Sequence, residues 1–264
     1  MKLYVFNYRR LIAYLLMLTS LIIIVSVLGS PTAGGIGVFS TQRKIPIYSV
    51  DTEEKLAAIT FDCAWGADDI PQILDTLKAA DIKATFFMVG QWAEKNPEMV
   101  KLMAQEGHDT ANHSYSHLRM GGLDGGKANS EIKKCGEIIE KLTGSKCELF
   151  RAPYGDYSNV LLSEAKQLGY YTIQWDVDSL DWKPGISKEE ILQRIEAKIK
   201  PGSIILFHND TPHTAKLLPE IISKLDAQGY RFVPVSELII REKYYIDNEG
   251  RQRTSLPESQ IKKE

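Results

Sequence analysis

The segment that decides the fold reads LAAITFD over residues 56–62, and a segment with a helical pattern, residues 68–80, follows it. Short β-rich runs go on alternating with amphipathic segments as far as residue 240. The strand-like runs are 56–62, 84–90, 108–113, 148–154, 170–178, 203–208 and 231–235, and the helix-like segments are 68–80, 91–106, 130–142, 158–168, 188–199 and 212–227. Seven strands that alternate with helices predict an α/β fold with a parallel sheet, either open or closed into a barrel.

Polar and charged side chains of the kinds that do chemistry gather where five of these strands end. In chain order they are Asp62 and Cys63, His113 and His117, Arg151 and Tyr154, Asp178, Asp181 and Trp182, and His208. The carboxyl ends of parallel strands meet at one edge of a sheet, and the sites of α/β enzymes assemble there. The clustering therefore predicts an enzyme with its site at that edge.

Charge is unevenly distributed along the chain. The 264 residues include 32 Lys and Arg against 34 Asp and Glu, for a net charge of −2. Residues 1–50 hold five of the basic residues and no acid, so the remainder has 27 basic and 34 acidic residues, a balance of −7. A body this acidic lacks the basic surface that binds a phosphate backbone, which argues against nucleic-acid binding. Three cysteines are too few for a disulfide scaffold.

Residues 1–30 have the pattern of a membrane-targeting segment. The run Leu11–Leu28 contains 18 residues without a charge, and basic residues precede it. This length just spans the apolar core of a bilayer, and basic residues before such a segment stay in the cytoplasm. We therefore predict a membrane anchor that leaves the rest of the chain outside the cytoplasm. A cleaved signal segment, which would release a secreted domain, is the competing interpretation.

The composition divides the rest of the chain into three parts. Residues 31–55 contain several glycines and predict a stem. Residues 56–240 hold the alternating strands and helices and predict one domain. Residues 241–264 are mostly charged or polar with no apolar period, which predicts a solvated tail. The sequence carries no signal of an oligomeric state.

His113 and His117 are four residues apart, a spacing that places two imidazoles on one helical face, where they could share a metal ion. Zinc proteases use the same spacing, but Ser114 stands where their glutamate base must be, so protease chemistry is disfavoured. Asp62 ends a buried strand, where a carboxylate could orient or deprotonate a metal-bound water. These residues indicate metal-assisted hydrolysis.

Arg151 and Tyr154 add two further expected functions. Arginine reads a carboxylate in a bidentate way, so Arg151 could hold Asp62 in place. The turn at Tyr154 lies between a proline and a glycine and could aim a backbone N–H at a developing oxyanion.

His208 ends the apolar strand 203–208 and could act as a general acid. That role requires a carboxylate to fix the tautomer of the ring, and the sequence offers Asp178 or Asp181. Trp182 and Leu206 could line an apolar slot for a small acyl group.

Together the residues form five ordered motifs, which are TFDC (60–63), HSYSH (113–117), RAPYG (151–155), DSLDW (178–182) and LFH (206–208). With them the sequence resembles the polysaccharide deacetylases of carbohydrate esterase family 4, which carry the NodB homology domain, and their sporulation-associated relatives from Gram-positive bacteria. The resemblance covers about residues 47–240. It implies a distorted (β/α)7 barrel and the removal of N-acetyl groups from aminosugars of chitin or peptidoglycan.

The resemblance also implies a role for each matching residue. Asp62 would be the base, oriented by Arg151, and His113 and His117 would bind a divalent metal. Tyr154 would supply the oxyanion N–H, Trp182 and Leu206 the acetyl pocket, and His208 the acid, supported by Asp178 or Asp181.

One position departs from the family pattern. The first motif usually ends in two aspartates, of which the second is a metal ligand, and here that position is Cys63. Cys63 could be a third ligand, which would favour Zn²⁺, with Co²⁺ also possible. It could instead be a buried spectator thiol or part of a disulfide, leaving two histidines and a weakened site, or Asp62 could become a ligand and another group the base. Cys135 and Cys147 could pair in an exported protein.

The sequence therefore supports three functional hypotheses. The first is a membrane-anchored, outward-facing N-deacetylase of aminosugars in peptidoglycan or a chitin-like glycan, dependent on a divalent metal, most simply zinc. The second is a glycan-binding protein on the same barrel, whose chemistry is impaired by the change at Cys63. The third is a deacylase for a small non-sugar amide, because the motifs describe the reaction better than the substrate.

Overall fold

In the computed structural model, residues 8–29 and 43–254 are described, and the chain forms two compact units, 1–42 and 43–264. The first unit contains helix α1 (Tyr8–Gly29), which covers the predicted membrane segment. Within the part of the chain that the structure describes, no helix combines the length and the hydropathy needed to cross a bilayer. The membrane anchor stays a prediction, and most of the predicted stem, residues 31–42, lies outside the described residues.

The second unit is built on one sheet, whose strands follow the order β10-β11-β1-β8-β2-β3-β4-β5-β6, with β7 paired to β8 and β9 to β2. The strands are β1 (Ser49–Val50), β2 (Leu56–Cys63), β3 (Thr85–Met88), β4 (Asp109–Asn112), β5 (Leu149–Phe150), β6 (Tyr171–Thr172), β7 (Val177–Asp178), β8 (Ser203–His208), β9 (Arg231–Phe232), β10 (Tyr244–Ile246) and β11 (Arg251–Thr254).

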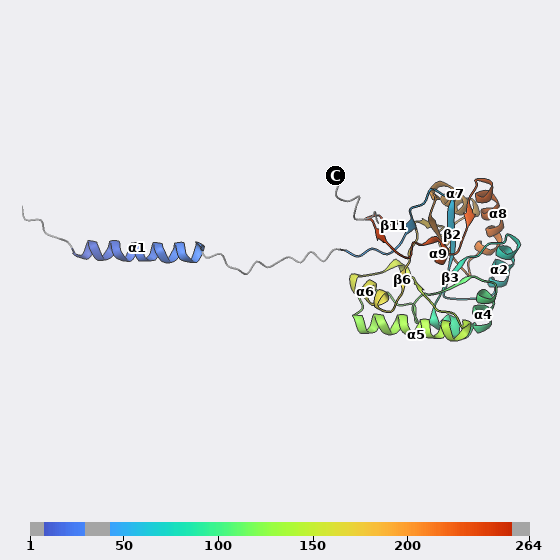
Figure 1. The fold of residues 1–264 in the computed structure, drawn as a ribbon, viewed down its shortest axis with the longest axis horizontal. Coiled ribbons are helices and arrows are strands. Elements are labelled where there is room, and N and C mark those ends of the chain that lie inside the picture. The colour runs from blue at the N-terminus through green and yellow to red at the C-terminus, as the bar shows by residue number, and fades with distance from the viewer. Residues whose placement is uncertain (1–7, 30–42, 255–264) are drawn as a thin grey trace, which may run out of the picture. The chain divides into compact units, whose positions relative to one another are not determined.

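Helices cover the outside of these strands (Figure 1). The helical elements of this unit are α2 (Ile70–Ala79), α3 (Gly90–Lys95), α4 (Pro97–Gln105), α5 (Gly125–Thr143), the 3₁₀ turn η1 (Pro153–Gly155), α6 (Asn159–Gln167), α7 (Lys188–Lys198), α8 (Thr214–Ala227) and α9 (Val235–Leu238). Of these, α9 packs on the inner face of the sheet, in the apolar cluster of Ala58 and Phe87. Local chemistry sets several of their ends. Ser187 and Glu190 form a capping box at the start of α7, and Gly144 ends α5 in a left-handed conformation.

The parallel strands form a curled sheet. Strands β7, β8, β2, β3, β4, β5 and β6 pair in parallel in that order. Past β6, Ile47 bridges to Ile173, and two residues later β1 pairs with β8 at Ser49 and Ser203. Residues 47–49 thus join the β6 end of the parallel set to β8, the second strand from the other end. The predicted α/β fold with a barrel-like parallel sheet is confirmed.

The apolar core lies between the sheet and the helices. Phe61 of β2 stacks on Phe86 of β3 with ring centroids 5.0 Å apart, and Phe207 of β8 lies 5.8 Å from Phe61. Successive side chains of a strand point to opposite faces. The residues on either side of Phe61, Thr60 and Asp62, therefore face away from this core, toward the inside of the curl.

The end of the domain differs from the expected solvated tail. Residues 244–254 form the hairpin of β10 and β11, and β11 pairs in parallel with β1. Gln252 is fully buried and bonds both the N–H and the carbonyl of Ile240. Charged side chains of strands at the sheet edge pair across the surface, as Arg253 does with Asp51 at 2.8 Å. The low hydrophobicity of this segment is therefore that of an edge hairpin, and the prediction of a tail from it was wrong. Residues 255–264 lie outside the described residues.

Two predicted elements are divided in the structure. The expected strand 170–178 is two short strands, β6 and β7, that pair with different neighbours. The expected helix 91–106 is α3 and α4, which meet at Asn96 and Pro97, where the proline begins the new helix.

Candidate active site

Strand pairing brings the candidate residues to one edge of the sheet. The register of β2 and β8 places Asp62 directly beside His208. His113 follows β4 and donates its backbone N–H to the carbonyl of Met88, and Arg151 follows β5 and donates to the carbonyl of Asn112. Since neighbouring strands lie only about 4.8 Å apart, these side chains converge at the carboxyl end of the strands.

Arg151 and Asp62 form a buried ion pair. Arg151 has no exposed surface, and its Nη1 donates to Asp62 Oδ1 at 2.6 Å. The bidentate contact that we expected is not formed, because Nη2 donates instead to the carbonyl of Gln174 at 3.1 Å. Burial alone would raise the pKa of Asp62, but the charge of Arg151 and its hydrogen bond, together with His113 and His208, outweigh burial and lower that pKa. The carboxylate stays ionised, with Oδ2 left for other partners.

His113 presents a lone pair to that second oxygen. Its Nδ1 lies 2.9 Å from the carbonyl oxygen of Arg151, and because a carbonyl only accepts, Nδ1 carries the hydrogen. Burial lowers the pKa of His113, so the ring is neutral and its Nε2 is an acceptor. Nε2 lies 3.4 Å from Asp62 Oδ2. Two acceptors thus face each other across a gap that a proton, a water or a cation could bridge.

His117 meets His113 through a loop and not through helical spacing. Their ring centroids are 5.1 Å apart. Ser114 and His117 have φ angles of 65° and 57°, so residues 113–117 do not form the expected helix. The carboxylate of Glu131 accepts two backbone N–H groups of the loop and fixes its path. Burial lowers the pKa of His117 to about 4, which leaves this ring neutral at pH 7 as well.

His208 is held by Asp181. Its Nδ1 lies 2.8 Å from Asp181 Oδ1, while Asp181 Oδ2 accepts the His208 backbone N–H at 2.7 Å and the Thr214 hydroxyl at 2.6 Å. Burial alone would lower the pKa of His208, but the bond to Asp181 and its charge outweigh it, and the pKa is raised. Asp178, also expected among the catalytic residues, accepts the N–H of Leu180 and shapes the turn. Asp181 is therefore the partner.

Cys63 lies on the opposite face of β2 from Asp62. It has no exposed surface and belongs to the apolar cluster of Phe61 and Trp92. Burial raises the pKa of its thiol well above the usual value, so the thiol is protonated. Across the described residues, no group of three or more His, Cys, Asp or Glu side chains is arranged to hold a metal ion. The structure does not bring the expected third ligand to the two histidines.

The donor set thus fits a metal ion in part. His113 and His117 are adjacent and neutral, which is the form of imidazole that binds a metal. The third position is the misfit, because Cys63 lies in the apolar core on the face of β2 opposite Asp62. Cys135 and Cys147 are also buried free thiols, so the pair that we considered from the sequence is not formed.

The residues expected around the acyl group lie beside this centre. Leu206 is buried on β8, two residues before His208, so both side chains face the same side. Trp182 is 55% exposed, which places it at the rim. Tyr154 has a left-handed φ of 61°, and its hydroxyl lies 3.1 Å from His117 Nδ1, a side-chain contact that the sequence did not predict.

Sequence reasoning missed the residues that position this machinery. Thr60 bonds Arg151 at 3.0 Å and could have been found, because it lies two residues before Asp62 and so shares its face. Gln174 and Thr214 have no local signal, since they reach their partners from 23 and 33 residues away.

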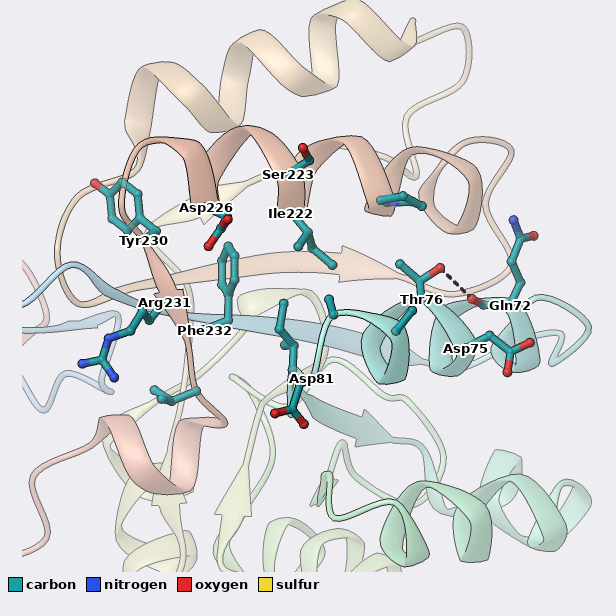
Figure 2. A pocket seen from close by; sticks show the side chains of 15 residues that line it. Gln72, Asp75, Thr76, Asp81, Ile222, Ser223, Asp226, Tyr230, Arg231 and Phe232 are labelled. Carbon is teal, nitrogen blue, oxygen red and sulfur yellow. Dashed lines mark hydrogen bonds between the residues drawn. The ribbon is translucent and has the colours of Figure 1, made fainter.

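A cavity of about 980 Å³ lies elsewhere in the domain, between α2, α8 and β9 (Figure 2). Phe232 of β9 lines it, and β9 pairs with Leu56 and Ala57 at the start of β2. The cavity is therefore at the amino end of the strands, and none of the residues predicted for chemistry lines it.

The sequence of this domain matches a known family. Residues 49–173 fit the family model described as polysaccharide deacetylase. A peptidoglycan-N-acetylglucosamine deacetylase of Bacillus cereus is 37% identical over 198 residues, which are 73% of this chain and 92% of that protein. The chain belongs to the polysaccharide deacetylase family. The predicted class of enzyme, a polysaccharide deacetylase hydrolase, is confirmed, and members of this family generally depend on a divalent metal.

Other relatives include a deacetylase named for a different sugar and an uncharacterized protein. A peptidoglycan-N-acetylmuramic acid deacetylase of Bacillus subtilis, PdaA, is 32% identical over 198 residues, which cover 74% of this chain and 75% of that protein. An uncharacterized Bacillus subtilis protein, YlxY, is 34% identical over 196 residues, and the match spans 74% of this chain but only 60% of YlxY.

One similar solved structure is the wild-type Bacillus anthracis protein BA3943, described as a pseudoenzyme of carbohydrate esterase family 4. It has a TM-score of 0.70 and 35% sequence identity, with 73% of this chain and 68% of that chain covered. The fold is thus shared with this family, as the resemblance implied, and the family includes at least one member described as a pseudoenzyme.

Proposed function

We propose that this chain removes N-acetyl groups from aminosugars of peptidoglycan. The observation that carries the proposal is the pairing of Asp62 with His208 on adjacent strands, each held by its own buried partner. Two groups whose environments drive their pKa values apart are the usual basis of acid and base assignments. The peptidoglycan deacetylases among the relatives support the choice of substrate.

In this proposal Asp62 is the base. Its lowered pKa keeps it ionised, and the Arg151 contact at Oδ1 leaves Oδ2 free to take a proton from the attacking water. His208 is the acid. Its raised pKa favours the protonated ring, and because Nδ1 is bonded to Asp181, Nε2 is the atom that gives a proton to the leaving nitrogen.

The acetyl group is bound between the two. Leu206 and Trp182 provide apolar surface for the methyl, and the backbone N–H at Tyr154 is assigned to the developing oxyanion. His113 and His117 are the residues that would hold a divalent metal, with Zn²⁺ the first choice and Co²⁺ the second. Bound there, the metal would act as a Lewis acid that lowers the pKa of water.

The location of the domain is part of the proposal. A glycan of the cell wall lies outside the cytoplasm, and an anchor or a cleaved signal within residues 1–30 would bring the domain to it. The basic residues before the apolar run at 11–28 support this orientation.

The test is acetate release by the full chain from peptidoglycan and from an N-acetylglucosamine oligomer, with added Zn²⁺ or Co²⁺. We expect release from at least one glycan and its loss in Asp62→Asn. Lys101→Gln, a change on α4 remote from the site, is the matched control for handling and folding. No release with either metal from a folded protein overturns the proposal, and retained glycan affinity in that case would indicate a binding protein.

A further inference from the structure

A cavity of about 490 Å³ shares His117 with the candidate active site but is otherwise lined by residues that the proposed reaction does not use. It opens between the end of β2, helix α3 and the loop that carries the two histidines. The side chains that matter here are Trp65, Gln91, Lys95, Ser116, His117 and Asp210.

Trp65 gives this cavity an apolar wall. The indole is 62% exposed and meets the ring of His117 edge-on, with centroids 5.1 Å apart. Its position beside His117 is thus defined while much of its surface stays open to solvent. An exposed indole at a polar site offers the flat apolar surface that the C–H face of a sugar ring covers.

Lys95 gives the cavity a positive charge. It ends α3, and in the part of the chain that the structure describes it takes part in no ion pair. The carboxylate of Asp210 does not reach it, but turns toward Gly66 and accepts its N–H at 3.1 Å. A Cβ on Gly66 would lie only 2.7 Å from Asp210 Cγ, which shows how closely that carboxylate packs on the backbone.

The remaining polar groups of the lining are Ser116 and Gln91, which are neutral hydrogen-bonding groups, and the imidazole ring of His117. Among the described residues that line the cavity, Lys95 is thus the side chain that can pair with an anionic group, while the Asp210 carboxylate is held at Gly66. A site with an apolar wall, neutral polar groups and a cation suits a sugar that carries a carboxylate.

We propose that this cavity binds a carboxylate-bearing sugar next to the sugar that is deacetylated. In peptidoglycan this is an N-acetylmuramic acid residue that carries no stem peptide, because only then does its lactyl ether end in a free carboxylate; a chitin chain has no such group. The proposal rests on the proposed function in that both concern one glycan. Trp65 stacks on the ring and Lys95 pairs with the carboxylate, so the cavity selects peptide-free peptidoglycan over neutral glycans.

The test compares two matched ligands by equilibrium binding. One is a peptide-free peptidoglycan oligomer, and the other is the same oligomer with its lactyl carboxyls reduced to alcohols. Binding is measured with the full chain in a His208→Ala background, so that neither ligand is consumed. We expect the carboxylate form to bind about three- to fivefold tighter at low salt, as one partly exposed ion pair allows, and this preference to shrink as salt is added.

Three variants separate the contributions of Lys95 and Trp65 to ligand binding. Lys95→Gln should bring the affinity ratio of the two ligands to about one, whereas Lys101→Gln, which removes the same charge from α4, should leave the ratio as it was. Trp65→Leu should weaken both ligands by a similar factor, roughly three- to tenfold, and leave the ratio unchanged.

Equal affinity of the parent protein for the two ligands overturns the inference, as does a ratio that survives Lys95→Gln. These outcomes do not depend on turnover. If acetate release fails while the binding ratio behaves as expected, the proposed function is wrong and this binding site stands. If release occurs without any preference for the carboxylate, the function stands and this inference is wrong.

Discussion

The two ends of the parallel strands differ in what occupies them. At the carboxyl end, buried groups hold one another, with Arg151 on Asp62 and Asp181 on His208. At the amino end lies a cavity of about 980 Å³ (Figure 2). The ion pair beside it joins exposed side chains, those of Arg231 and Glu54, which are 71% and 67% exposed. The difference teaches that fixed charge, and not volume, marks the place for chemistry in this fold.

The sharpest test of this contrast is the loss of the acid. His208→Ala should lower the rate of acetate release by roughly 10²- to 10⁴-fold, because it removes the group assigned to protonate the leaving nitrogen. Bound metal, measured by elemental analysis, should be unaffected. His117→Ala should instead lose bound metal, because it removes one of the two histidines assigned to the metal. Metal lost from the His208→Ala protein would contradict the roles assigned here.

The next largest effect is the difference in stability lost when each of two arginines is replaced. Arg151→Met leaves Asp62 buried without its partner and should lower the free energy of unfolding by about 3–5 kcal/mol. Arg231→Met breaks an exposed pair at the other end and should cost less than about 1 kcal/mol. Urea denaturation of both variants measures the contrast. Equal losses would mean that the two ends are not as different as the contacts suggest.

The pH profile sharpens the comparison within the active end. His208 must be protonated to act as the acid, so activity is present below its raised pKa and falls as pH rises through that pKa. Asp181→Asn removes the main cause of the raised pKa, so the alkaline limb should move to lower pH. Asp178→Asn should move it less, because Asp178 acts on His208 only through a weaker charge interaction. Rates of acetate release across pH provide the measurement, and identical shifts would contradict the assignment of Asp181.

The smallest expected effect concerns Cys63. Cys63→Ala removes a buried sulfur from an apolar cluster and should lower the free energy of unfolding by about 1 kcal/mol. Metal content and acetate release should stay within about twofold of the parent protein, since the thiol faces away from the histidines. A large loss of bound metal in this variant would restore Cys63 as a ligand.

The sequence predicts most of the scaffold, because the signals are local. The apolar run of β2 with its final Asp62, and the glycine that ends α5, can each be recognised within a few residues. The two histidines are also found by their spacing, although the helix inferred from it is wrong, since left-handed residues bend the segment into a loop. The spacing of the two histidines thus predicts correctly that they are neighbours, but not the backbone conformation between them.

What the sequence does not predict depends on long-range pairing. Gln174 acts on Arg151 through its carbonyl, which every residue has, so its side chain gives no signal. The choice of Asp181 over Asp178 depends on a turn at Leu180 with a φ of 58°. For Cys63 a signal was present in the alternation of β2, because Phe61 and Cys63 must share a face. The family motif suggested a ligand at position 63, but the alternation of the strand predicts that its side chain points into the core.

The pairing of β11 with β1 has a consequence for how the domain is made. Arg253 and Asp51 are 202 positions apart in the chain, yet they meet in the finished sheet. At roughly 5–20 residues per second, a ribosome takes about 10–40 s to make the intervening segment, and β1 waits unpaired on that side throughout. The sheet is thus completed by residues made long after β1, and a chain cut at residue 240 would leave that edge open to neighbouring chains.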